Sequence, residues 1–501
     1  MVESRRTLRT VIGDTMYRTV DLVVIGAGPG GYAAAFRAAD LGHRVVLVER
    51  EPNPGGVCLL RGCIPSKALL SVARLLEELR RAAEKGIELA QPPTVNLART
   101  QAWKKELVAR MSRGIRELAR ARRVELLRGT ARFLDSRTVE VRQDGEAAPV
   151  RLRFRKAVIA TGARPAFPPG LAPDGEVILS SDHVLDLATV PPTALIIGGG
   201  YIGLEMGRFL AACGSQVTIV EVLDRLLPGT DPELVRPVQR ALSRIGVRIL
   251  TSHRVEELHV QDGLAHATLL NQRDGSAQTA QFHLVLVATG RVPATEGLGL
   301  AEGGITIDRQ GAIVTNRCGQ TSNPDVYAVG DCRGGIMLAH KARHEGLVVA
   351  DALSGKRASF NYAAVPQVVF TDPEIACVGW TEQDATRLGL ASEVEVLRFP
   401  FAAIGRAAIQ NSTDGLVKVI VERGTGRLLG VGIVGPEAGE LIAEATLAVQ
   451  SRATLEELRH AIHPHPTASE AIEEVAWLAA GGAVHLYKPP RTQPRRRTKR
   501  R

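Results

Sequence analysis

Two cysteines, Cys58 and Cys63, stand close together in the chain, with four residues between them. A disulfide across so short a loop removes little entropy from the unfolded chain, so its value would be chemical and not structural. If a helix begins just before Cys63, the positive end of its dipole favours the thiolate, and Lys67 adds a cation one turn further on. The spacing predicts a redox-active dithiol, with two unrelated buried thiols as the alternative.

Half of a zinc site is a second alternative for this pair. The nearest other cysteine, Cys213, lies far along the chain and has no partner at metal-ligand spacing. We therefore expect no metal.

A histidine near the C-terminus has the setting of a general base. His465 lies between Pro464 and Pro466, which restrict its backbone, and Glu470 follows five residues later. A carboxylate that reaches back to one ring nitrogen fixes the tautomer and raises the basicity of the other nitrogen. A dithiol enzyme needs such a base to take the proton of a substrate thiol. The alternative is a pair of surface histidines in a proline-rich turn.

The dithiol follows a segment that is typical of a dinucleotide-binding turn, in which a strand, a glycine turn, a helix and a second strand lead to an acid. These parts are the strand 20–25, the glycines Gly26, Gly28 and Gly31, the helix 32–41, the strand 44–48 and Glu49. The first glycine allows the tight turn, the second lets the backbone approach a pyrophosphate, and the third allows close helix–strand packing. The helix N-terminus then receives the phosphates, and the acid binds a ribose hydroxyl.

The same pattern recurs once. Its parts are the strand 193–197, the glycines Gly198, Gly200 and Gly203, the strand 216–220 and Glu221. Two dinucleotide folds in one chain indicate two cofactors and an enzyme that passes electrons between them. Glu221 favours NAD because a carboxylate binds the ribose diol and repels a 2′-phosphate, although Arg225 is a nearby cation.

Three further segments have a place in this pattern. Residues 160–165 and 288–293 resemble each other, and each follows an apolar strand, so both predict turns where the chain crosses between domains. The strand 325–331 ends in Asp331, an acid that can bind a polyol hydroxyl.

Length and composition are ordinary for a globular protein. With 501 residues and 45% hydrophobic content it is expected to form about three domains. Six cysteines at irregular spacings do not indicate a secreted disulfide framework, no apolar run reaches membrane-spanning length, and the cytoplasm is the expected location.

Residues 488–501 carry eight positive charges and no acid, and without them the net charge falls from +10 to +2. This tail is predicted to be disordered, and the nearly neutral body argues against nucleic-acid binding.

These residues together resemble the pyridine nucleotide–disulfide oxidoreductases, and most closely the members that oxidise dihydrolipoamide. The resemblance runs from about residue 17 to about residue 477. Its motifs are the dithiol segment, both glycine turns, the strand ending in Asp331, the segments 337–342, 370–376 and 435–442, and the segment 465–470. It implies an α/β fold with two Rossmann-like dinucleotide-binding domains, for FAD and NAD, and a C-terminal α/β dimerisation domain that forms a homodimer.

The resemblance also implies roles in a reaction that carries electrons from protein-bound dihydrolipoamide to NAD. Cys58 is the thiol that exchanges with the substrate, and Cys63 is the thiol beside the flavin. His465 is the base, oriented by Glu470. Lys67 and Glu205 pair beside the flavin, near the place where hydride passes to the nicotinamide. The cofactor-binding positions are Gly26, Gly28, Gly31, Glu49, Lys67, Ala131, Gly162, Asp331, Ala339, Gly198, Gly200, Gly203, Glu221 and Gly290.

Domain boundaries and partners follow from the same resemblance. The expected parts are an FAD-binding domain with the dithiol (17–165), an NAD-binding domain (166–288), a central segment that completes the FAD domain (289–358), a dimerisation domain (360–486) and a basic tail (487–501). The expected partners are lipoyl domains of a 2-oxo acid dehydrogenase acyltransferase or the H protein of glycine cleavage, with no membrane. A glutathione-reductase-like or mercuric-reductase-like enzyme is the alternative.

Four positions depart from the family pattern. Val57 stands where threonine is usual, Ala294 where asparagine is common, and Pro464 is unusual between two histidines. Arg61 places a cation between the thiols, and it is expected either to lower a thiol pKa or to tolerate a more acidic substrate. None of the four removes a catalytic group.

Overall fold

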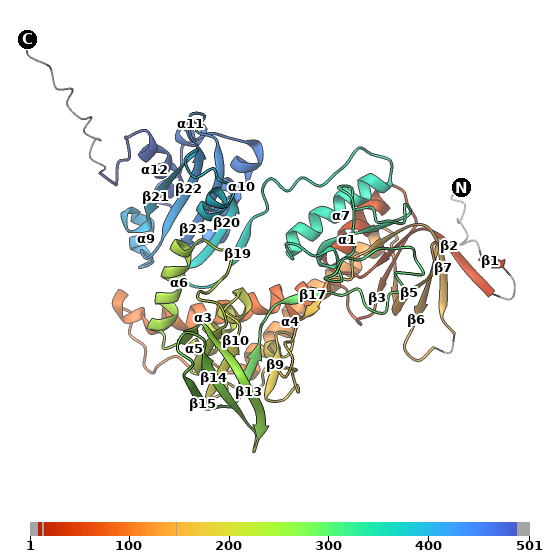
Figure 1. Cartoon of the computed structure of the whole chain (residues 1–501), viewed down its shortest axis with the longest axis horizontal. Coiled ribbons are helices and arrows are strands. Elements are labelled where there is room, and N and C mark those ends of the chain that lie inside the picture. Colours follow the sequence, from red (N-terminus) through yellow and green to blue (C-terminus); the bar gives the residue numbers. More distant parts are fainter. Residues whose placement is uncertain (1–8, 13–14, 147, 488–501) are drawn as a thin grey trace, which may run out of the picture. The chain divides into compact units, whose positions relative to one another are not determined.

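The chain forms two compact units (Figure 1). The computed structural model describes residues 9–12, 15–146 and 148–487, so the tail predicted to be disordered, 488–501, lies outside the described residues. Unit 1 comprises Met1–Asp224 and Arg248–Asn361, and unit 2 comprises Arg225–Val247 and Tyr362–Arg501. The domain boundaries given above were placed from the order of the motifs along the chain, whereas these two units are defined by their compactness. The two divisions are therefore not equivalent, and the boundaries stay predictions.

Unit 1 contains an eight-stranded sheet with the order β4-β3-β2-β7-β6-β5, in which β1 also pairs with β2 and β18 with β7. Strands β3, β7 and β18 continue the parallel part, whereas β5 and β6 are antiparallel. The bounds are β1 Arg9–Ile12, β2 Thr15–Ile25, β3 Val45–Glu49, β4 Glu125–Arg128, β5 Thr130–Asp135, β6 Thr138–Arg142, β7 Val150–Ile159 and β18 Val326–Ala328.

The parallel part of this sheet is covered on both faces, which explains its continuous apolar strands. Leu22, Val23 and Val24 of β2 are fully buried, as expected for a central parallel strand. Helix α1 (Pro29–Asp40) packs on α7 (Ala339–Leu353), and the two lie side by side in Figure 1. Because ligands of such sheets bind beyond the carboxyl ends of the strands, the first glycine turn lies in the expected place.

A second, fully parallel sheet carries the second glycine turn. Its order is β12-β11-β10-β16-β9, and a three-stranded antiparallel sheet, β13-β14-β15, accompanies it. The two similar segments predicted as crossing turns contain β8 and β17, which pair with each other. The bounds are β8 Ala163–Pro165, β9 Ile178–Ser180, β10 Thr193–Ile197, α5 Tyr201–Ala212, β11 Gln216–Glu221, β12 Arg248–Thr251, β13 His253–Gln261, β14 Leu264–Asn271, β15 Ala277–Phe282, β16 Leu284–Val287 and β17 Arg291–Pro293.

The expectation that no apolar run reaches membrane-spanning length was wrong. The helical run Gly56–Arg80, with a mean hydropathy of 1.4, passes that test by length and composition. It consists of α2 (Gly56–Arg61) and α3 (Cys63–Arg80), and α3 packs against α4 (Leu97–Ala121) and α5 inside unit 1. Leu69, Leu70 and Ala73 of this run are buried within the unit.

Unit 2 is built on an antiparallel sheet with the order β19-β20-β23-β22-β21. Helices α10 and α12 pack on this sheet and share one apolar core with it. The bounds are α6 Pro232–Arg244, β19 Gln367–Val369, β20 Glu374–Gly379, α8 Glu382–Arg387, β21 Val394–Pro400, α9 Gly405–Ile409, β22 Leu416–Glu422, β23 Leu428–Gly435, α10 Ala438–Ser451, α11 Leu455–His460 and α12 Glu470–Ala479.

A buried lysine attaches α6 to this sheet. Lys418 on β22 is 3% exposed, and its Nζ lies 2.6 Å from a carboxylate oxygen of each of Asp231, Glu233 and Glu382. The three carboxylates are close enough together to hold a metal ion, but Lys418 pairs with all three, and Arg398 also pairs with Glu233 and Glu382. This cluster holds residues 225–247 within unit 2.

Lys418→Met is expected to lower the free energy of unfolding of unit 2 by about 3–5 kcal/mol, because it leaves buried Asp231 without its cation. Chemical denaturation followed by circular dichroism measures the change. Arg423→Met is the matched control at an exposed position, where a change within about 0.5 kcal/mol is expected. Equal midpoints for the two variants would show that the cluster contributes nothing to stability.

Candidate functional site

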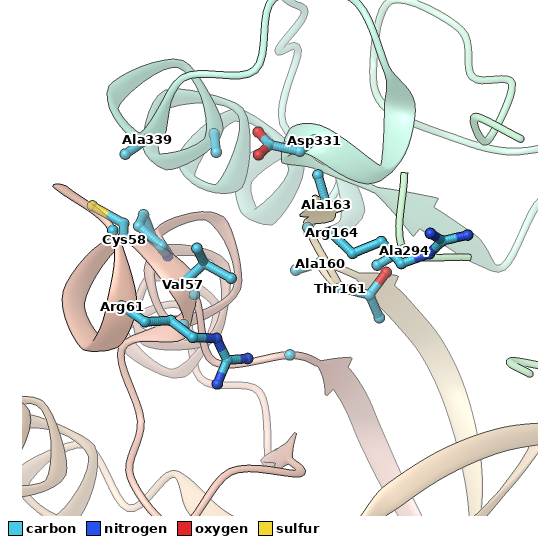
Figure 2. Close-up of a pocket in the computed structure, with 18 of the residues that line it drawn as sticks. Val57, Cys58, Arg61, Ala160, Thr161, Ala163, Arg164, Ala294, Asp331 and Ala339 are labelled. Atoms are coloured by element: carbon cyan, nitrogen blue, oxygen red, sulfur yellow. The ribbon is translucent and has the colours of Figure 1, made fainter. Parts of the chain in front are cut away.

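A cavity of about 390 Å³ in unit 1 brings together most of the residues predicted for the flavin and dithiol site. In Figure 2, Val57, Cys58 and Arg61 lie on one side of it, with Asp331 and Ala339 above them. The predicted residues that line it are Gly26, Gly28, Glu49, Cys58, Cys63, Lys67, Ala131, Gly162, Glu205, Asp331 and Ala339. Among the described residues, those predicted for the site but not lining this cavity are Gly31, Gly198, Gly200, Gly203, Glu221, Gly290, His465 and Glu470.

The first glycine turn has no room for side chains. Gly26 has φ +99°, and a Cβ there would lie 2.5 Å from the carbonyl oxygen of Ala160. A Cβ on Gly31 would lie 1.8 Å from the carbonyl oxygen of Gly26, so this glycine packs beneath the turn without lining the cavity. Helix α1 begins at Pro29 without a side-chain cap, which leaves its N-terminal end to attract a phosphate.

The second glycine turn repeats this construction. Gly198 has φ +116°, and a Cβ there would lie 2.4 Å from the carbonyl oxygen of Ala288. A Cβ on Gly203 would lie 2.1 Å from the carbonyl oxygen of Gly198, whereas Gly200, which precedes α5, has open space. Gly290 also has positive φ, +122°, and open space beside it.

The two acids that follow the glycine turns are held in the same way. Glu49 accepts hydrogen bonds from the backbone N–H of Ala27 (2.7 Å) and of Glu51 (3.0 Å). Glu221 accepts from the N–H of Gly199 (2.6 Å) and of Leu223 (2.8 Å). Each carboxylate is therefore fixed beside its turn, where it can bind a ribose diol.

The dithiol lies at the junction of two helices. Cys58 is in α2, and Cys63 begins α3, so the condition that a helix begins just before Cys63 is met. Both thiols are free, and their mutual hydrogen bond raises the pKa of Cys58 while it lowers the pKa of Cys63 to about 7. Burial opposes the shift at Cys63, and the positive charge of Lys67 supports it. Of the two, Cys63 is therefore the more acidic thiol.

Alkylation of Cys63 by iodoacetamide in the reduced protein is expected to rise with a midpoint near pH 7, because the thiolate is the nucleophile. Lys67→Met is expected to move the midpoint to higher pH, since the nearby cation is lost. Peptide mass spectrometry as a function of pH measures both, with Lys105→Met, on the exposed face of α4, as the matched control. Faster alkylation of Cys58 than of Cys63 would contradict the assignment.

The pair predicted beside the flavin is present. Nζ of Lys67 lies 2.7 Å from Oε2 of Glu205, and the Glu205 side chain is 3% exposed. Lys67 is one turn after Cys63 on α3, and Glu205 is on α5, so the ion pair joins the dithiol helix to the second dinucleotide fold. Both residues line the cavity.

Asp331 follows β18, and burial raises the pKa of its carboxyl group. The backbone beside it is held by a group that sequence reasoning missed, because Glu345 on α7 accepts the N–H of Gly330 at 2.6 Å. Glu345 is fully buried and pairs with Arg333 (2.6 Å) and Lys341 (2.7 Å). The sequence did contain a signal for this pair, because a spacing of four residues places Lys341 and Glu345 on the same face of a helix.

Arg61, which was expected either to lower a thiol pKa or to tolerate a more acidic substrate, forms ion pairs with two carboxylates. Its guanidinium pairs with Glu51 (2.9 Å) and Asp182 (3.1 Å), so two carboxylates compensate its charge. The cation whose charge favours the thiolate form of both cysteines is Lys67, although the pKa of Cys58 is raised overall. Arg61 instead connects α2 to the segments that follow β3 and β9.

The cavity residues fit a flavin dinucleotide. The glycine turn leaves space at the N-terminus of α1, and Glu49 and Asp331 are placed to bind hydroxyl groups. Thr161, labelled in Figure 2, has a buried hydroxyl oxygen without a hydrogen-bond partner among the described residues, which a bound group can satisfy.

The predicted base and its carboxylate lie in unit 2, and they contact each other. Nδ1 of His465 lies 2.8 Å from Oε1 of Glu470, the first residue of α12. The other oxygen of Glu470 accepts the N–H of Thr467 at 3.0 Å. Burial tends to raise the pKa of Glu470, but the hydrogen bonds from His465 and Thr467 lower it. The His465 side chain is 75% exposed.

Comparisons with known proteins agree with this architecture. The family model described as pyridine nucleotide-disulphide oxidoreductase matches residues 20–346, and the model of its dimerisation domain matches residues 365–476. The chain is 43% identical to a dihydrolipoyl dehydrogenase from Thermus scotoductus, covering 94% of this chain and 99% of the relative. It is 40% identical to a dihydrolipoyl dehydrogenase from Geobacillus stearothermophilus, covering 95% and 99%.

Two solved structures are similar over most of the chain. LpdA from Mycobacterium tuberculosis has a TM-score of 0.85 and 29% identity, covering 92% of this chain and all of that one. The HOCl-induced flavoprotein disulfide reductase RclA from Escherichia coli has a TM-score of 0.80 and 28% identity, covering 91% and 99%. With its dithiol, its two glycine turns and its dimerisation domain, the chain belongs to the pyridine nucleotide-disulphide oxidoreductase family, whose members are flavoproteins that use FAD and a nicotinamide dinucleotide.

Proposed function

We propose that this protein oxidises protein-bound dihydrolipoamide to lipoamide and reduces NAD. The observation that carries the proposal is the Cys58/Cys63 pair, whose second thiol is the more acidic and lies in one cavity with the Lys67–Glu205 ion pair. The relatives named dihydrolipoyl dehydrogenase support the choice of substrate. Glu221 supports NAD because its fixed carboxylate suits a ribose diol.

The substrate half-reaction is a thiol–disulfide exchange. In the oxidised enzyme, a substrate thiolate attacks the sulfur of Cys58, and the bond to Cys63 breaks to release the Cys63 thiolate. The second substrate thiol then displaces Cys58, so that one disulfide forms in the substrate for the one lost in the enzyme. The low pKa of Cys63 makes it the better leaving group.

His465 is proposed to take the proton of the attacking substrate thiol at Nε2. Glu470 holds Nδ1, which fixes the tautomer and stabilises the imidazolium that forms. FAD, held at the first glycine turn with Glu49 and Asp331, would supply the two-electron chemistry that links the dithiol to NAD.

The dimerisation domain supports a homodimer. We propose that the base of one subunit serves the dithiol of the other, and that the dimer docks lipoyl domains of a 2-oxo acid dehydrogenase acyltransferase or the H protein of glycine cleavage. Retention of a purified lipoyl domain by the immobilised enzyme tests the docking.

Steady-state rates test the proposal. Dihydrolipoamide with NAD is expected to give the highest kcat/KM, and glutathione disulfide or mercuric ion with NADH or NADPH to give rates lower by about 100-fold or more. A preference for either alternative acceptor would identify a different disulfide reductase.

A further inference from the structure

His463 stands two residues before the proposed base, but its surroundings differ. The His463 side chain is 6% exposed, whereas that of His465 is 75% exposed. Nε2 of His463 lies 3.0 Å from Oε1 of Glu444 on α10. Nδ1 lies 3.0 Å from the carbonyl oxygen of Ala461 and 3.6 Å from Oε2 of Glu473 on α12.

This geometry requires a charged ring. A backbone carbonyl and a carboxylate both accept hydrogen bonds, and a neutral imidazole has only one N–H to donate. His463 can therefore satisfy Glu444 and Ala461 together only as an imidazolium. The pKa of His463 is raised accordingly, first by the hydrogen bond to Glu444, against the effect of burial.

The two histidines attach one turn to the same helix. His465 binds Glu470, at the start of α12, and His463 lies beside Glu473, three residues later on that helix. Through Glu444, His463 also ties the turn to α10, which His465 does not contact through any described hydrogen bond. A change at His463 thus alters the anchoring of the segment that carries His465.

We propose that His463 is a positioning residue whose protonated ring fixes the turn 461–469, so that the alignment of His465 depends on the charge of His463. The proposal rests on the proposed role of His465 as the base. It makes the activity depend on the protonation of a group that does not meet the substrate.

The direction of the pH dependence follows from the raised pKa. The ion pairs are fully formed below the ordinary pKa of histidine and are lost as pH rises through the higher pKa of the folded protein. The charged groups that face the ring are Glu444 on α10 and Glu473 on α12, and neither can donate to the neutral ring. His460 on α11 pairs with Glu456 and is 70% exposed, so it belongs to a separate pair.

His463→Gln keeps a side chain that can donate a hydrogen bond but removes the positive charge. At neutral pH it is expected to lower kcat/KM for dihydrolipoamide by about 10- to 100-fold, because misplacement of a catalytic group by about 1 Å has effects of this size. Reduction of ferricyanide by NADH is expected to stay within about twofold, because that reaction draws electrons from the reduced flavin without a substrate thiol to deprotonate. The ratio of wild-type to variant kcat/KM is expected to fall toward one as pH rises through the pKa of His463.

Three further measurements separate positioning from general damage. Hydrogen exchange in residues 461–469 is expected to be faster in His463→Gln, and also in wild type at alkaline pH. Glu444→Gln is expected to give the same pH-dependent loss, and it serves if His463→Gln does not fold. His460→Gln is the matched control, with an exposed histidine–glutamate pair and no expected effect.

The outcomes distinguish this inference from the proposed function. If His465→Ala abolishes dihydrolipoamide oxidation while His463→Gln and Glu444→Gln keep the wild-type pH profile, His463 has no positioning role. If His465→Ala keeps full activity, His465 is not the base, and the proposed reaction must use a different general base. A loss in His463→Gln that is equal at every pH overturns the dependence on charge.

Discussion

A dimer that combines a Cys58→Ser chain with a His465→Ala chain is expected to show about half of the wild-type activity, although both parental homodimers are inactive. Cys58→Ser removes the exchanging thiol, and His465→Ala removes a base whose contribution is typically about 10²- to 10⁴-fold. If each site takes its dithiol from one subunit and its base from the other, the mixed dimer contains one intact site.

The arrangement of the same two changes within one chain gives the opposite result. A chain with both Cys58→Ser and His465→Ala, paired with a wild-type chain, has no intact site if sites are shared and one intact site if they are not. Two affinity tags isolate both kinds of mixed dimer, and dihydrolipoamide oxidation per flavin is measured in each. Activity in the second dimer and none in the first would return His465 to a role within its own subunit.

Wild-type enzyme is expected to prefer NAD over NADP by about 10²- to 10⁴-fold in kcat/KM, because a fixed carboxylate meets the 2′-phosphate. Glu221 is 7% exposed and accepts the N–H of Gly199 and Leu223, so it cannot easily turn away. Glu221→Gln keeps the shape and removes the charge. This change is expected to reduce the preference by about tenfold or more, mainly by a lower KM for NADP.

Glu49→Gln is the matched control, because Glu49 has the same two backbone partners at the first turn. It is expected to weaken flavin retention, measured as the rate of FAD release, without a change in coenzyme preference. A wild-type enzyme that uses NAD and NADP equally well would refute the assignment of Glu221. A shift of coenzyme preference in Glu49→Gln would indicate that the first glycine turn binds the nicotinamide coenzyme and the second binds FAD.

The sequence predicted those parts of the site that are local along the chain. A glycine turn needs a strand before it and a helix after it, and the close contacts of Gly31 with Gly26 and of Gly203 with Gly198 lie within five residues. The acids at the ends of the second strands follow from the same local βαβ geometry. The start of α3 at Cys63 agrees with the helix supposed to begin near Gly62, whose dipole favours the thiolate.

Other contacts join residues that are far apart in the chain, and only the tertiary structure determines them. The Lys67–Glu205 pair spans 138 residues, and the family resemblance was needed to anticipate it. Arg61 was expected either to lower a thiol pKa or to tolerate a more acidic substrate, and its ion pairs with Glu51 and Asp182 depend on which carboxylates the fold brings near. His463 and His465 are alike in sequence, yet one ring is buried between Glu444 and Glu473 and the other is exposed, because the packing of α10 and α12 determines which ring loses its water.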